Sequence, residues 1–97
     1  MDLPPNAPKP DPAMERRVKR WLNKLGLTDT VVQPHAEEAF SGYDNGCGHY
    51  SSGYEAGDAY AHILPQGRRS LDRDIRNLGD FLIDYGRFLA ARSNYAG

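Results

Sequence analysis

The chain has 97 residues, of which 12 are lysine or arginine and 13 are aspartate or glutamate, so its formal net charge is −1. This length is enough for one domain with a modest core, and a charge so close to zero argues against a dedicated nucleic-acid binder. Because the single cysteine cannot form an internal disulfide and no apolar run approaches the roughly 20 residues of a membrane span, we expect a small soluble protein of the cytoplasm.

A proline-rich arm occupies residues 1–11, ahead of a single predicted helical domain over residues 12–97. Prolines stand at positions 4, 5, 8 and 10. Each of them fixes φ and lacks an N–H donor, so the arm is expected to be extended rather than helical.

The first helix is predicted over residues 12–25. Asp11 is a suitable N-cap acceptor, and Pro12 fits the first helical position. Apolar residues then recur at helical spacing as far as Leu25, with lysines and arginines on the other faces. Gly26 supplies the left-handed residue that ends many helices.

The segment from Leu25 to Gly67 is chemically distinct from the rest of the chain. It contains no lysine or arginine, but it holds six acidic residues, all three histidines, the only cysteine and four of the six tyrosines. Basic amphipathic helices flank it on both sides. We therefore expect the functional surface to lie in this segment.

Local structure in the middle of the chain is harder to predict. Residues 28–33 are rich in β-branched side chains and could form a brief strand or an extended connector. Pro34 can open a short helix that ends at Gly42. Residues 41–53 are dense in glycine, serine, asparagine and aspartate, which predicts a loop, and the pattern over residues 54–64 favours another helix.

The last helix is predicted over residues 70–93, with Ser70 as its N-cap. Its apolar residues alternate at steps of four and three and form a seam that could pack on another helix or make a homodimer: Leu71, Ile75, Leu78, Leu82, Tyr85 and Leu89. Gly79 and Gly86 lie beside this seam and either open a groove for a neighbouring backbone or are merely tolerated.

The predicted fold is all-α, with two long amphipathic helices (12–25 and 70–93), one or two short helices and a glycine-rich central loop. An α+β alternative places short strands near residues 30–33 and 54–64. In the all-α fold the core is expected to comprise Trp21, Leu22, Leu25, Phe40, Ile63, Leu78, Leu82, Tyr85 and Leu89.

Nitrogen and sulfur ligands in the middle segment raise the possibility of a zinc site. Cys47 stands two residues before His49, and the other histidines are His35 and His62. The spacing is weak evidence, because the sequence has no C-x-x-C or H-E-x-x-H motif.

Glu55, Asp58 and His62 are spaced by three and four residues, which places them on one side of the predicted helix. Together with Cys47 and His49, they define an alternative function as a zinc or iron site or a small metal-dependent subunit. Otherwise they form a solvated helix face, with no cofactor and no catalytic residues, and this is the interpretation that we favour.

Tyrosines alternate with small polar residues and carboxylates in the middle segment, a composition typical of recognition surfaces. The residues expected to bind a partner are Tyr43, Asp44, Tyr50, Tyr54, Glu55 and Asp58. We therefore predict a non-enzymatic interaction module, an accessory subunit or an inhibitor-type regulator. It would dock through its acidic, Tyr/Gly-rich middle on a larger protein with a basic surface.

Overall fold

The computed structural model describes residues 11–44 and 50–96, with side chains for residues 11–43 and 50–91. It contains four α-helices: α1 (Pro12–Leu25), α2 (Asp29–Asp44), α3 (Gly53–Tyr60) and α4 (Asp72–Ala96). Two short 3₁₀ turns, η1 (Ala61–Ile63) and η2 (Gln66–Arg68), connect α3 to α4. These ranges contain no strand, so the all-α prediction is confirmed and the α+β alternative, with strands near 30–33 and 54–64, is wrong.

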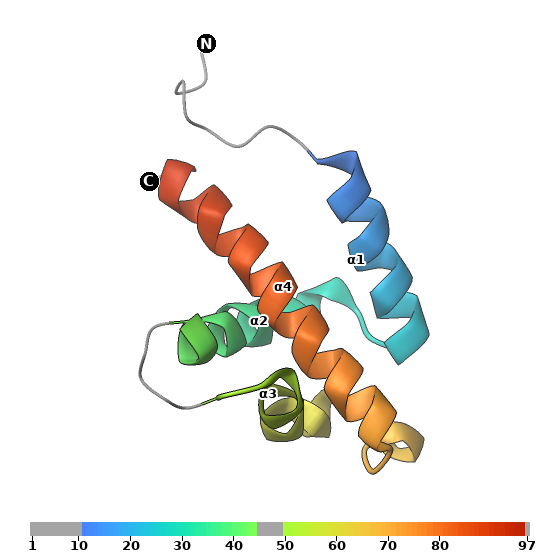
Figure 1. Cartoon of the computed structure of the whole chain (residues 1–97). Coiled ribbons are helices and arrows are strands. Elements are labelled where there is room, and N and C mark those ends of the chain that lie inside the picture. Colours follow the sequence, from blue (N-terminus) through green and yellow to red (C-terminus); the bar gives the residue numbers. More distant parts are fainter. Residues whose placement is uncertain (1–10, 45–49, 97) are drawn as a thin grey trace.

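Helix α4 is the central element of the fold (Figure 1). It packs extensively on α3 and α2 and only lightly on α1. In Figure 1, α1 lies along one side of α4, while α2 and α3 cross it on the other. None of the helices in the described part of the chain is long and apolar enough to cross a membrane.

The first helix has the predicted bounds and the predicted ends. The Oδ1 atom of Asp11 accepts a hydrogen bond from the backbone N–H of Met14 at 3.1 Å, and Gly26 adopts the left-handed conformation with φ of 71°. An ion pair of 2.7 Å between Arg17 and Asp84 joins α1 to α4. The basic flank is thereby attached to the rest of the domain.

The prediction of a strand or extended connector over residues 28–33 is wrong, because α2 already begins at Asp29 and passes through Pro34. Val32, Ala36 and Ala39 are spaced by four and three and are completely buried. Burial of this helical face outweighs the β propensity of the valines and the backbone hydrogen bond that proline cannot donate.

The predicted central loop is also shorter than expected, because α2 continues through residues 41–44. Residues 45–49, the middle of that loop, lie outside the described ranges. Helix α3 begins at Gly53, where the Ser52 hydroxyl accepts a hydrogen bond from Glu55 N–H at 3.2 Å. The helix predicted over 54–64 is thus present, but its last turn is the 3₁₀ turn η1.

Helix α4 begins two residues after the predicted start and extends to Ala96. Ser70 is therefore not its N-cap. Four residues of the predicted seam are buried inside the monomer, Ile75, Leu78, Leu82 and Tyr85, whereas Leu71 is exposed. The seam thus serves the internal core, and a homodimer through it stays a prediction.

Two glycines of α4 mark the places where other helices cross it. A Cβ atom on Gly79 would overlap the backbone of Gly53 and lie 2.6 Å from the Gly57 nitrogen. A Cβ atom on Gly86 would overlap the backbone carbonyl of Ala36 and lie 2.6 Å from the Phe40 Cβ. The glycines therefore permit the close helix approach that their spacing suggested.

The core agrees with the prediction at its centre and differs at its edges. Leu25, Leu78, Leu82 and Tyr85 are buried, while the remaining predicted members are partly buried around them: Trp21, Leu22, Phe40, Ile63 and Leu89. Additional buried residues include Val32, Ala36 and Ala39 of α2, Ala56 of α3, and Leu64 directly after η1. The alanines among them, Ala36 and Ala39 of α2 and Ala56 of α3, allow these two helices to approach α4 closely.

Candidate functional site

Histidine and tyrosine side chains of the lysine- and arginine-free segment gather between α2 and α3. His35 of α2 lies 5.3 Å from Tyr60, at the end of α3, and 5.7 Å from His62 of η1, measured between ring centroids. The Tyr50 ring lies 6.0 Å from that of Tyr60. We call these four residues the His–Tyr cluster.

A hydrogen bond connects the two tyrosines of this cluster. The Tyr50 hydroxyl donates to the Tyr60 hydroxyl at 3.2 Å. Burial raises the pKa of Tyr60 well above its ordinary value, and the nearby charge of Glu38 acts in the same direction. The cluster thus holds Tyr60 in its neutral, protonated form.

His35 brings an unsatisfied polar atom to the edge of the cluster. Its Nδ1 atom is buried and has no hydrogen-bond partner among the described residues, although the Oε1 atom of Glu38 lies 3.5 Å away. At this distance a charge interaction is possible, but a well-formed hydrogen bond is not. Glu38 thus places a carboxylate beside the His–Tyr cluster. In the described residues no lysine or arginine forms an ion pair with this carboxylate.

Two of the predicted partner-binding residues contribute to the stability of α3. The Tyr54 hydroxyl donates to the Asp72 Oδ1 atom at 3.0 Å, which links α3 to the start of α4 and raises the pKa of Tyr54. Glu55 accepts from the Ser51 backbone N–H at 2.9 Å and from the Ser51 hydroxyl at 2.5 Å. These hydrogen bonds lower the pKa of Glu55 and hold its carboxylate at the surface.

The other predicted binding residues are distributed over the two helices. Tyr43, in the last turn of α2, is 40% exposed, and Asp58 of α3 is exposed. Asp44 ends α2, and Tyr50 is half-buried in the His–Tyr cluster. The six residues thus belong to α2, α3 or the approach to α3.

The predicted metal ligands are only partly within the described ranges. Cys47 and His49 lie outside them. Glu55 bonds to Ser51, and no ion pair joins Asp58 to His62 in the part of the chain that is described. Within that part no three histidine, cysteine, aspartate or glutamate side chains are arranged to hold a metal ion. The zinc or iron site stays a prediction that elemental analysis of the purified protein can test.

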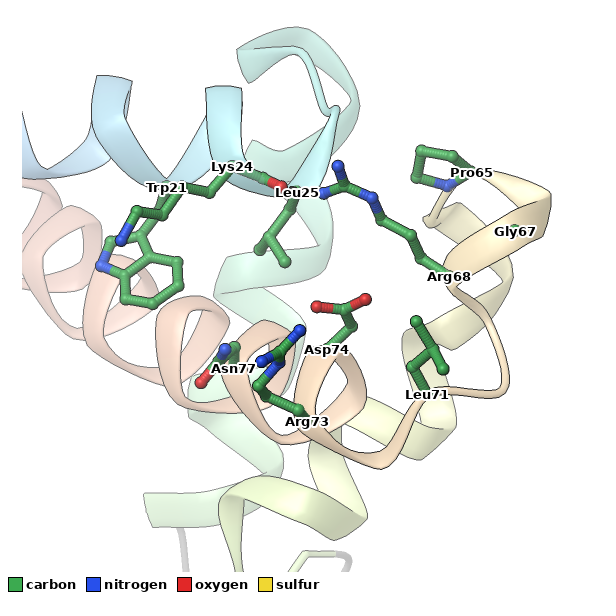
Figure 2. A pocket seen from close by; sticks show the side chains of 10 residues that line it. All are labelled: Trp21, Lys24, Leu25, Pro65, Gly67, Arg68, Leu71, Arg73, Asp74 and Asn77. Atoms are coloured by element: carbon green, nitrogen blue, oxygen red, sulfur yellow. Dashed lines mark hydrogen bonds between the residues drawn. The ribbon is translucent and has the colours of Figure 1, made fainter.

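A second surface feature lies on the side of α4 that faces α1 (Figure 2). It is an open groove of about 750 Å³ between the end of α1, η2 and the first turns of α4. The residues that characterise it are Trp21, Lys24, Arg68, Leu71, Arg73 and Asp74. We call it the α1–α4 groove.

Sequence reasoning missed both of these assemblies. The contacts of His35 depend on how α2 lies relative to α3 and η1, which the predicted short helix from Pro34 to Gly42 does not indicate. The groove joins residues 44 positions apart, Lys24 and Arg68, and no local pattern reports such a contact.

Comparison with known proteins gives no relative for this chain. No protein-family model, no curated protein and no solved structure matches it.

Proposed function

We propose that this protein is a small interaction module, an accessory subunit or inhibitor-type regulator, whose α2–α3 surface docks on a basic patch of a larger protein. The observation that carries the proposal is the state of its carboxylates. Glu37, Glu38, Glu55 and Asp58 are all exposed, and in the described residues no lysine or arginine forms an ion pair with any of them. Their negative charge remains available to a partner.

The neighbouring aromatic residues support the same function. Tyr50 and Tyr60 are held by their mutual hydrogen bond and by packing against His35 and the core. Aromatic side chains fixed before binding lose little conformational entropy when a partner arrives. Tyr43, exposed at the end of α2, adds a further amphipathic contact.

The proposal is tested by affinity capture from the native cell extract with three baits. These are the wild-type chain, the double variant Glu37→Gln/Asp58→Asn, and a control, Glu15→Gln/Asp80→Asn. The control removes the same charge from α1 and α4. We expect a basic protein to be captured by wild type and control and to be lost from the first variant, with its binding weakened by salt.

Capture that is equal for all three baits would refute the assignment of the α2–α3 surface. Circular dichroism of each bait shows whether the fold is intact. The carboxylates removed from α2 and α3 are exposed and make no hydrogen bond in the described residues. We therefore expect the variant Glu37→Gln/Asp58→Asn to unfold at the same temperature as wild type.

A further inference from the structure

The α1–α4 groove collects cations from three separate elements. Lys24 lies at the end of α1, Arg68 in η2 and Arg73 in the first turn of α4. Asp74 is the only carboxylate among the lining residues, so the groove has three cations and one anion, a net charge of +2. The whole chain, in contrast, has a net charge of −1.

Two of these cations, Arg68 and Lys24, are held in position by contacts within the domain. The Nη1 atom of Arg68 donates a hydrogen bond to the backbone carbonyl of Lys24, and the Lys24 ammonium lies 4.9 Å from the centre of the Trp21 ring. Within the described ranges, none of Lys24, Arg68 and Arg73 forms an ion pair with a carboxylate. The groove therefore offers positive charge to a ligand from outside.

The groove also exposes an apolar side chain. Leu71 is 48% exposed, the highest value for a large hydrophobic side chain in the described part of the chain. Trp21 is half-buried on the opposite wall, and buried Leu25 lies between them (Figure 2). An aliphatic or aromatic group placed between Leu71 and Trp21 would remove apolar surface from water on both sides.

The polar groups near the middle of the groove favour a peptide over a phosphate chain. The Asp74 carboxylate points into the space between Arg68 and Asn77 in Figure 2. A carboxylate there can accept from the backbone N–H of a peptide, whereas a phosphodiester backbone has no N–H to donate to it. Asn77 can both donate and accept, as an extended peptide backbone requires.

We propose that the α1–α4 groove binds an acidic segment of a partner protein, with one aliphatic or aromatic side chain of that segment seated between Leu71 and Trp21. Carboxylates of the segment would pair with Lys24 and Arg73. This site is independent of the acidic α2–α3 surface and has the opposite charge. A chain with both surfaces can bridge two different proteins.

The test uses the full chain, attached through an N-terminal tag and panned with a random peptide library displayed on phage. We expect the selected peptides to share several carboxylates around one apolar residue. One such peptide is then synthesised with a fluorescent label, and its affinity is measured by anisotropy. The double variant Lys24→Gln/Arg73→Gln, and separately Leu71→Ser, should each weaken binding by about tenfold or more.

Two matched controls make this result specific. Arg16→Gln/Arg20→Gln removes the same charge from α1 outside the groove, and Glu37→Gln/Asp58→Asn alters only the acidic surface. Both should bind the peptide as tightly as wild type. The second control also separates this proposal from the proposed function, because each surface has its own variant.

Several outcomes would overturn the proposal. These are failure to select any peptide, selection of peptides without carboxylates, and equal affinity for wild type and the groove variants. Displacement of the peptide by single-stranded DNA at the same charge concentration would show that charge alone is recognised. Self-association of wild type in sedimentation, lost in the groove variants, would identify a second copy as the occupant.

Discussion

Gly79 of α4 and Gly57 of α3 meet backbone to backbone. A Cβ atom on Gly79 would lie 2.6 Å from the Gly57 nitrogen, and one on Gly57 would lie 3.0 Å from the Gly79 nitrogen. Real Cβ atoms do not come so close to a backbone that cannot move aside. This crossing fixes the position of α3, and with it the surface that we propose for partner binding.

The substitution Gly79→Ala is expected to lower the free energy of unfolding by about 2 kcal/mol, although alanine favours helices by about 1 kcal/mol over glycine. The reason is that the new methyl group must push α3 away from α4. Urea unfolding followed by circular dichroism measures this change. Gly67→Ala is the matched control, because a Cβ atom there would meet nothing within 4 Å.

An unchanged midpoint for Gly79→Ala would contradict the close crossing. We expect the Gly67→Ala control to stay within about 0.5 kcal/mol of wild type.

The hydrogen bond between Tyr85 and Asp29 joins α4 to the start of α2. The Tyr85 side chain is buried, and its hydroxyl donates to Asp29 Oδ1 at 2.6 Å. Since hydrogen bonds to charged groups contribute more than neutral ones, Tyr85→Phe should lower the free energy of unfolding by about 1.5 kcal/mol. Tyr43→Phe, at an exposed position, should leave it unchanged, and equal effects of both substitutions would count against this role.

The N-cap of α3 gives a third prediction. Ser52→Ala removes the acceptor for the Glu55 backbone N–H and should cost about 1 kcal/mol of stability. Ser70→Ala is the control, because Ser70 precedes α4 without capping it. Thermal unfolding of the two variants should therefore differ. A larger loss of stability in Ser70→Ala than in Ser52→Ala would mean that Ser70 does cap α4.

The pKa of Tyr60 predicts how stability changes in alkali. Because the folded protein raises this pKa, the folded state keeps its proton above about pH 10, where an unfolded tyrosine loses it. The contribution of Tyr60 to stability is thus complete below pH 10 and declines as the pH rises further. Urea unfolding at about pH 8 and about pH 11 should show this loss.

In the variant Tyr60→Phe, the alkaline decline should be smaller. Absorbance of tyrosinate during titration provides an independent measurement, because the variant should lack a late-titrating group. Because the pKa of Tyr54 is also raised, part of the late phase should remain in Tyr60→Phe. A late phase with the same amplitude as in wild type would assign the raised pKa to tyrosines other than Tyr60.

The parts of the fold that the sequence predicted best are those with local signals. Asp11, Pro12 and Gly26 mark the ends of α1 without reference to any other helix, and Gly79 and Gly86 indicate close contacts by their small size. The start of α2 was missed, because the two valines and Pro34 are local signals against a helix that begins before the proline. The burial of Val32 against the other helices outweighs these local signals.

The candidate sites were predicted less well because both depend on tertiary contacts. The sequence indicates that the middle segment is acidic and aromatic, but not that His35 meets Tyr60 and His62. Nor does it indicate that Tyr54 and Glu55 make internal hydrogen bonds. Composition locates a region of interest, and geometry then decides which side chains remain available.

The absence of lysine between Leu25 and Gly67 has a practical consequence for the laboratory. The lysines of the chain are Lys9, Lys19 and Lys24, so amine-reactive surfaces and dyes attach at the N-terminal end and leave α2, α3 and α4 unmodified. Amine coupling would thus present the acidic surface to solution, but it would also modify the groove at Lys24. Protein immobilised in this way should keep the proposed binding of a basic partner and lose the proposed binding of an acidic segment.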